Sequence, residues 1–244
     1  MSELQGQLKN KDVTWSLGAT LGVGLAAFLV PQLVAGIALA VVAESRGQTL
    51  EELIGGDNIA MSFVLTLAIA IIGTFILRLY IKKKDFFKRL GFRKTKWEDV
   101  GMGVPGYIVY FFMAFIVNAI FAAYFPELAD QAQDTGFDNA MGIELVYAFM
   151  TLVILAPVFE ELLFRGFVFR GLAKHTSFWP AAISTSALFG LAHGQLNVAI
   201  DTFLIGMVAS WLVWKTNSLW PAILLHVIKN LVAYLFIFVF EVSV

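Results

Sequence analysis

The sequence predicts an all-α protein: a polytopic transmembrane helical bundle of about seven spans, eight at most, with a polar site inside the membrane. Of the 244 residues, 59% are hydrophobic and 14% are charged, and the mean hydropathy is +0.79. A soluble domain carries roughly a quarter charged residues. The charges are also unevenly spread, since nine of the 17 Lys and Arg residues fall within 78–96. The long uncharged runs that remain exclude a soluble globular enzyme, a disordered chain and a nucleic-acid-binding protein.

The first three predicted spans contain no charged residue. A helix that crosses a bilayer needs about 20 predominantly apolar residues, and the runs 15–42, 59–77 and 101–124 meet this requirement. The first run is much longer than the roughly 7–15 apolar residues of a signal peptide. We therefore expect a retained first span rather than a cleaved leader.

The last four predicted spans hold polar groups inside the membrane or at its edge. The fourth ends at two glutamates, the fifth ends before a histidine, the sixth contains an aspartate, and the seventh contains a histidine and a lysine. A charge in lipid costs at least about 2.5–3.5 kcal/mol, so such residues are functional candidates. These four runs are 143–159, 178–192, 197–214 and 219–240.

No internal repeat, linker or low-complexity tract divides the chain. We expect a single membrane domain over 1–244, in which 1–142 form scaffold spans and 143–244 contain the catalytic spans.

The basic residues within 82–99 predict a cytoplasmic loop by the positive-inside rule, and hence a cytoplasmic N-terminus. The acidic loop 125–142 is then outside, and with seven spans the C-terminus is outside too. The alternative role of the basic loop is capture of anionic lipid or of an acidic substrate segment.

Several kinds of chemistry are excluded by composition. The chain has no cysteine, which rules out disulfides, Cys-ligated zinc, iron–sulfur clusters and a thiol nucleophile. The formal net charge of −1 provides no global field that would attract an acidic partner. Ser184 and Ser186 lack a G-x-S-x-G setting, and the H-E-x-x-H zinc-protease helix is absent.

The motif Glu160-Glu161-x-x-x-Arg165 closes the fourth run. On a helix Glu161 and Arg165 are i,i+4 neighbours and can form an ion pair. Glu160 lies about 100° further round the helix and points elsewhere. Taken alone, the motif fits an ordinary ion pair at a cytoplasmic helix end as well as it fits a site.

Two histidine motifs complete the polar set. His193 ends the fifth run and by itself reads as an interfacial residue. His226 and Asn230 share one face of the seventh span at membrane depth, which favours a site over simple helix packing. Together with Glu160, these residues provide a general base, imidazoles that orient water or donate protons, and donors for an oxyanion. They suit the hydrolysis of an amide by water without a covalent nucleophile, although two His and a Glu from three helices could also bind zinc.

In these three motifs the chain resembles the CAAX-processing and bacteriocin-processing (CPBP, Abi/Rce1-like) intramembrane protease family, which includes the Rce1-type CAAX endopeptidases. The family pattern EExxxR, FxxxH and HxxxN reads here as Glu160-Glu161-x-x-x-Arg165, Phe189-x-x-x-His193 and His226-x-x-x-Asn230. The motifs span about 70 residues and occur in the family's order. The stretch 90–93 resembles the family more loosely, and 1–80 adds only a compatible membrane arrangement.

The resemblance implies an endopeptidase with a site inside the bilayer that opens to the cytoplasm. By motif position, Glu160 would activate the water and His193 would help hold it. His226 and Asn230 would stabilise the oxyanion, and Arg165 would pair with Glu161. A glutamate mechanism without a cofactor is favoured, because asparagine is a poor zinc ligand; if zinc is used, its ligands would be His193, His226 and Glu160.

The expected partners are the lipid bilayer and a membrane-embedded or lipid-anchored protein or peptide, cut in CAAX-type or leader/tail processing, and no nucleic acid. The expected location is a prokaryotic cytoplasmic membrane, and the sequence makes no prediction of oligomeric state. Two alternatives remain: a non-catalytic immunity or scaffold protein of the same fold, and a small transporter. Lys229 is expected to snorkel or to pair, with Asp201 as the candidate partner.

Overall fold

The computed structural model describes residues 13–49, 53, 59–129, 137 and 140–240. Within these residues the chain is helical and contains no strand, so the predicted helical bundle is confirmed. The N-terminal segment 1–12, predicted to be cytoplasmic, and the acidic residues of 130–136 and 138–139 in the predicted outside loop lie outside this description.

The first part of the chain forms three long helices joined by short ones. All three long helices begin and end within four residues of the predicted spans. Ser16 caps the first of them, accepting a hydrogen bond from the N–H of Ala19. The helices are α2 (Leu17–Arg46), α4 (Ile59–Tyr80), α5 (Phe86–Leu90), α6 (Trp97–Gly101), α7 (Gly103–Tyr124) and α8 (Pro126–Ala129).

One continuous helix of 33 residues, Ile143–His175, replaces the predicted fourth span of 143–159. The prediction was wrong at its end, because the glutamates do not terminate the helix; Arg165 partners Glu161 internally and the helix runs on. We call this element the glutamate helix. Its segments are α9 (Ile143–Phe149), η1 (Met150–Leu155), α10 (Ala156–Glu160), η2 (Glu161–Phe169) and α11 (Arg170–His175), of which η1 and η2 are π-helical.

Three more apolar elements complete the bundle. They are α12 (Phe178–Leu191), α13 (Leu196–Thr216) and α14 (Trp220–Tyr234), the last continued by η3 (Leu235–Val239). Six helices in the described residues are long and apolar enough to cross a membrane, and α12, with 14 residues, is shorter. The seven predicted runs therefore each correspond to a helix.

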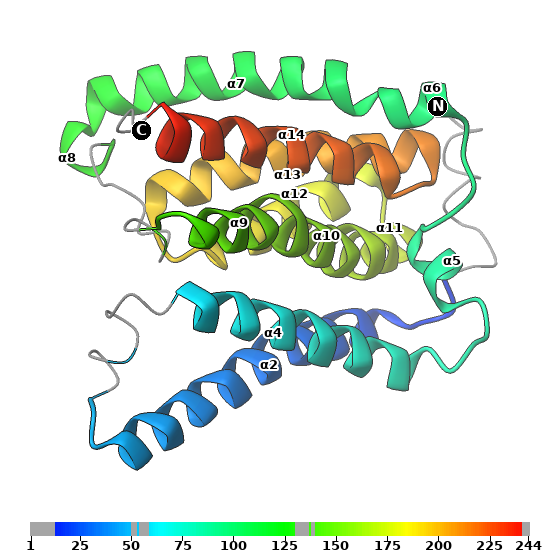
Figure 1. Ribbon diagram of the computed structural model, residues 1–244. Coiled ribbons are helices and arrows are strands. Elements are labelled where there is room, and N and C mark those ends of the chain that lie inside the picture. Colours follow the sequence, from blue (N-terminus) through cyan, green and yellow to red (C-terminus); the bar gives the residue numbers. More distant parts are fainter. Residues whose placement is uncertain (1–12, 50–52, 54–58, 130–136, 138–139, 241–244) are drawn as a thin grey trace.

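The helices lie roughly side by side, with the glutamate helix between two groups (Figure 1). On one side are α2 and α4, which pack on each other; on the other are α12, α13, α14 and α7. Helix α13 is the most enclosed, with 56% of its most apolar stretch buried against 11% for α2 and for α4. Its close approach to α12 depends on Gly190, where a Cβ atom would lie 2.6 Å from the carbonyl oxygen of Ala199.

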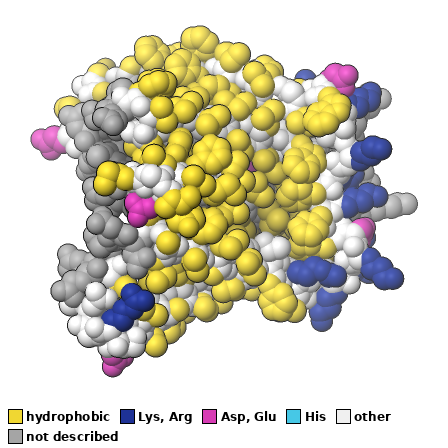
Figure 2. Space-filling model, viewed as in Figure 1, with side chains coloured by type: hydrophobic (Ala, Val, Ile, Leu, Met, Phe, Trp, Pro, Cys, Tyr) yellow, Lys and Arg dark blue, Asp and Glu magenta, His cyan; other side chains and the backbone are white. Residues whose placement is uncertain are grey.

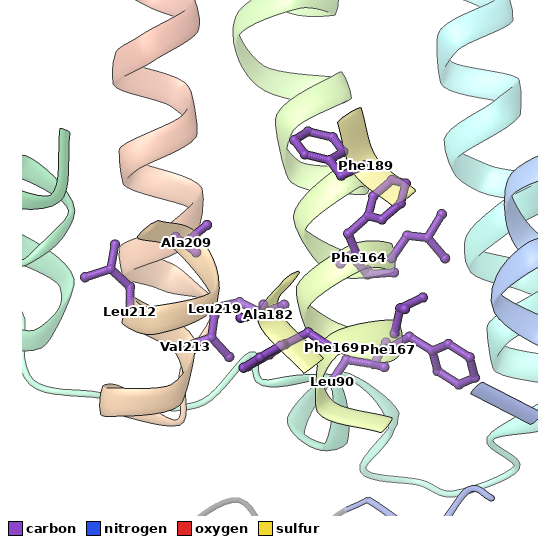
Figure 3. Packing of buried hydrophobic residues seen from close by; sticks show 14 of the residues in the cluster. Leu90, Phe164, Phe167, Phe169, Ala182, Phe189, Ala209, Leu212, Val213 and Leu219 are labelled. Carbon is purple, nitrogen blue, oxygen red and sulfur yellow. The ribbon is translucent and has the colours of Figure 1, made fainter. Parts of the chain in front are cut away.

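The core is centred on the aromatic residues of η2 (Figure 3). Phe164 lies against Phe189 of α12, with ring centroids 4.9 Å apart. Phe167 stacks on Trp15 at 4.9 Å, which attaches the start of α2 to the glutamate helix. This packing places the stretch that follows the glutamates at the centre of the protein.

The outer surface of the helices is apolar, as a lipid-facing surface requires (Figure 2). Lys and Arg side chains gather at one end of the bundle, on the right in Figure 2, where Figure 1 shows α5, α6 and α11. The stretch between α4 and α7 contributes most of these basic residues. The clustering agrees with the charge asymmetry on which the predicted orientation depends.

Candidate functional site

The centre of the candidate site is a buried group made by Glu161, Arg165 and His226. One carboxylate oxygen of Glu161, Oε1, accepts a hydrogen bond from Nη1 of Arg165 at 3.0 Å and lies 3.0 Å from Nδ1 of His226. The three side chains are at most 5% exposed. Because a carboxylate oxygen only accepts, His226 donates through Nδ1, which fixes its tautomer when it is neutral. The predicted pairing of Glu161 with Arg165 is confirmed.

Glu160 lies on the other side of the same imidazole. Its Oε2 is 3.7 Å from Nε2 of His226, and its side chain is 26% exposed, against 1% for Glu161. The ring of His226 therefore lies between two carboxylates that belong to consecutive residues. One carboxylate is enclosed and neutralised by an arginine; the other is accessible.

The aromatic ring of Phe189 connects the remaining parts of the site. The guanidinium carbon of Arg165 lies 4.3 Å from the ring centroid, a cation–π distance. The rings of His193 and His226 lie edge-on to Phe189 at 5.0 and 5.8 Å. Nδ1 of His193 is 2.8 Å from the carbonyl oxygen of Phe189, to which it donates, so neutral His193 keeps Nε2 as an acceptor. The contacts with Phe189 therefore link His193 to the site.

Asn230 lies one helical turn beyond His226 on the same face of α14. Its side-chain nitrogen donates to the carbonyl oxygen of Leu152, in η1, at 2.7 Å. One turn further, the hydroxyl of Tyr234 donates to the carbonyl of Leu145 at 2.9 Å. His226, Asn230 and Tyr234 therefore form a polar stripe that attaches α14 to the glutamate helix.

The guanidinium of Arg165 occupies a seat formed by small residues of α12 and α13. A Cβ atom on Gly206 would lie 2.6 Å from Nη2 of Arg165 and 2.9 Å from Oγ of Ser186. Nε and Nη2 of Arg165 and Oγ of Ser186 are buried without a hydrogen-bond partner among the described residues. The guanidinium of Arg165 itself fills the seat, and the ring of Phe189 covers one of its faces.

Replacing Gly206 with alanine should disturb this seat. The added methyl group pushes Arg165 off Phe189 or away from Glu161, and we expect a loss of about 1–3 kcal/mol in the free energy of unfolding and a fall in any peptidase activity of about 10–100-fold. Thermal unfolding and peptide cleavage measure the two effects. The matched control is Gly36→Ala in α2, where nothing lies within 4 Å of the new Cβ atom; equal effects of both changes would contradict the seat.

Residues 142–232 match the family described as "Type II CAAX prenyl endopeptidase Rce1-like". Over this segment the chain is similar to the Rce1-like family. The Rce1-like segment includes all six predicted site residues, and the resemblance stated above is confirmed. No solved structure matches the chain.

Two curated proteins are similar to parts of the chain. The "Putative membrane peptidase YdiL" of Bacillus subtilis (strain 168) is 24% identical over 143 residues, which are 57% of this chain and 58% of that protein. The "Uncharacterized 24.3 kDa protein" of Escherichia coli is 35% identical over 99 residues, 38% of this chain and 45% of that protein. The chain therefore aligns with about half the length of each relative.

The Rce1-like segment brings its predicted residues together to different degrees. Glu161 contacts both Arg165 and His226, and Glu160 lies 3.7 Å from His226. Residues that sequence reasoning gave no role in the site are Phe189, Gly206 and Ser186. Phe189 is the first residue of the FxxxH motif, so the sequence contained a signal for it. Ser186 was considered only as a nucleophile. No sequence pattern indicated Gly206.

A second polar contact lies outside the Rce1-like motifs. Nζ of Lys229 is 3.2 Å from one carboxylate oxygen of Asp201, which confirms the predicted pairing. The other oxygen of Asp201 accepts a hydrogen bond from the hydroxyl of Tyr110. The contact joins α7, α13 and α14, so one residue of the predicted scaffold, Tyr110, pairs with the predicted catalytic spans.

The side chains proposed for a zinc-dependent variant do not form a ligand set. Among the residues that the structure describes, no three His, Asp or Glu side chains converge as metal ligands. Both nitrogens of His226 face carboxylate oxygens, and Nδ1 of His193 is engaged by a backbone carbonyl. The donors in this arrangement do not fit a zinc ion.

Proposed function

We propose that the protein is an intramembrane endopeptidase that hydrolyses a peptide bond of a membrane-associated protein or peptide with water activated by a glutamate. The observation on which the proposal depends is the placement of His226 between Glu161 and Glu160 inside an apolar helical bundle. The Rce1-like match over 142–232 supports the reaction class. The proposal needs neither a nucleophilic side chain nor a cofactor.

The two glutamates differ in environment, and this assigns their roles. Glu161 is enclosed and bound to Arg165, so it is held as a carboxylate that orients His226. Glu160 has the greater exposure and no arginine or lysine partner among the described residues. Glu160 is therefore the general base that can reach a water molecule.

The proposed mechanism needs a proton on each nitrogen of His226. Nδ1 donates to Glu161, and Nε2, which lies 3.7 Å from Oε2 of Glu160, is the nitrogen next to the proposed base. A proton on Nε2 also offsets the net negative charge that two carboxylates and one guanidinium would leave in a low-dielectric interior. His226 then serves as a donor to an oxyanion or as the source of a proton for the leaving amine.

The reaction balances with these groups alone. Glu160 takes a proton from water as the water oxygen attacks the carbonyl carbon, and His226 donates a hydrogen bond to the oxyanion. The carbon–nitrogen bond then breaks, and the proton taken from water passes to the amine nitrogen. The products are a carboxylic acid and an amine. His193 would orient the water through its unprotonated Nε2.

The surroundings of the site give the expected substrate and orientation. A site in an apolar bundle suits peptides held at the membrane, such as CAAX-type C-termini or the leaders and tails of exported proteins. We place the basic end, which includes 82–99, in the cytoplasm of a prokaryotic cell by the positive-inside rule. The N-terminus is then cytoplasmic.

A panel of fluorogenic peptides, some prenylated and CAAX-like, tests the proposal on protein purified in detergent. We expect cleavage of at least one peptide, insensitive to a strong chelator and abolished in His193→Ala. Cleavage that is lost on chelation and restored by zinc would overturn the glutamate mechanism. Undiminished cleavage in His193→Ala would contradict its role, and no cleavage of any peptide would favour a scaffold or immunity protein.

A further inference from the structure

The bond from Asn230 to the glutamate helix is directed at one specific backbone carbonyl. Nδ2 of Asn230 lies 2.7 Å from the oxygen of Leu152, within the π-helical segment η1. This bond uses a side-chain donor that the family resemblance would give to an oxyanion. The question is why the carbonyl of Leu152 needs a donor from another helix.

Pro157 removes the N–H that would pair this carbonyl in the π-helical register of its own helix. In the π-helical register of η1, the N–H of Ala156 bonds to the oxygen of Thr151, five residues earlier. The next bond in that register would run from residue 157 to the oxygen of Leu152. Residue 157 is proline, which has no N–H to donate. In an apolar bundle an unpaired carbonyl is costly, and Asn230 pairs it.

The hydrogen bond from Asn230 to Leu152 also fixes the position of His226 along the glutamate helix. Asn230 follows His226 by four residues on one face of α14, and the glutamates follow Leu152 by about two helical turns. A helix held at Asn230 and, further along, at Tyr234 can slide little past the glutamate helix. The contacts of His226 with Glu160 and Glu161 depend on that register.

We infer that Pro157, the carbonyl of Leu152 and Asn230 form a clamp that sets α14 against the glutamate helix and so positions His226. Asn230 is thereby a positioning residue. Its relevance to catalysis rests on the proposed function, whereas the clamp itself is a property of the fold.

A double-mutant cycle between Asn230→Ala and Pro157→Ala tests the clamp, because alanine at 157 restores an N–H to the glutamate helix. We expect Asn230→Ala to lower the unfolding midpoint by about 2–6 °C in the wild-type background. In the Pro157→Ala background the same change should lower it by less than half as much. Tyr234→Phe is the control, since its bond to Leu145 should show no coupling to residue 157. Pro157→Ser replaces Pro157→Ala if the latter does not fold.

Cleavage rates are also measured for the wild type, Asn230→Ala, Pro157→Ala and the double variant, at temperatures well below their unfolding midpoints. These rates distinguish a clamp from a direct hydrogen bond between Asn230 and the oxyanion. For a clamp, the loss of kcat caused by Asn230→Ala is about tenfold or more and shrinks to within about threefold in the Pro157→Ala background. An equal loss in both backgrounds, or midpoint shifts that simply add, would overturn the inference. If the wild type cleaves nothing, the proposed function fails and the midpoints still decide the clamp.

Discussion

Replacing Glu160 with glutamine is expected to lower the rate of peptide cleavage by about 10²–10⁴-fold while the protein still folds. Glutamine has nearly the same shape but cannot accept a proton from water. The side chain of Glu160 is partly exposed and has no arginine partner among the described residues, so its charge contributes little to the fold. The measurement is kcat on a cleaved peptide, with thermal unfolding of the same sample.

Two further substitutions make this prediction specific. Glu98→Gln, at an exposed position of α6, should leave both activity and unfolding unchanged. Glu161→Gln should lower stability as well as activity, because it leaves Arg165 buried without its carboxylate partner. If Glu160→Gln retains wild-type activity, or loses it only by unfolding, Glu160 is not the base.

The membrane architecture was predictable because it depends on composition and run length alone. Each of the seven apolar runs corresponds to a helix, with ends displaced by a few residues. The exception is the glutamate helix, which continues to His175. Two acidic residues after an apolar run look like a helix end at an interface. The continuation is possible because Arg165 neutralises Glu161 and the surrounding helices cover both residues, and neither fact can be read from one segment.

The candidate site was predictable only in its residue types. The motifs named the polar side chains, and the i,i+4 spacing gave the pairing of Glu161 with Arg165. At 1.5 Å per residue along straight helices, the spans expected from the sequence put His193 about 10 Å deeper than His226. In the structure the rings of both histidines lie edge-on to Phe189, with centroid distances of 5.0 and 5.8 Å. The seat of Arg165 on Gly206 was not predictable, because it depends on how closely α13 approaches the glutamate helix.

Replacing Arg165 with leucine is expected to have the largest effect on stability, about 3–5 kcal/mol in the free energy of unfolding, since it leaves the buried carboxylate of Glu161 without a cation. Arg165→Lys should lose less stability than Arg165→Leu but should remain less stable than the wild type. An ammonium group lacks the planar set of N–H donors of a guanidinium and does not stack on Phe189 as a guanidinium does. Denaturant unfolding in lipid–detergent bicelles gives the free energies.

The decisive variant replaces both partners. Glu161→Leu combined with Arg165→Leu removes the uncompensated charge, so most of the stability should return. Activity should not return, because His226 then has no carboxylate at Nδ1. A pair nearer the solvent provides the comparison: Arg89 and Asp85, whose side chains are 15% and 42% exposed, have the same i,i+4 spacing and an N–O distance of 2.8 Å. There the hydrogen bond from Arg89 holds the pKa of Asp85 below its ordinary value, yet water replaces the partner, and Asp85→Asn should change unfolding little. If the double leucine variant is no more stable than Arg165→Leu, the loss comes from packing around the guanidinium rather than from the unpaired charge. If it is stable and active, the pair does not position His226 for catalysis.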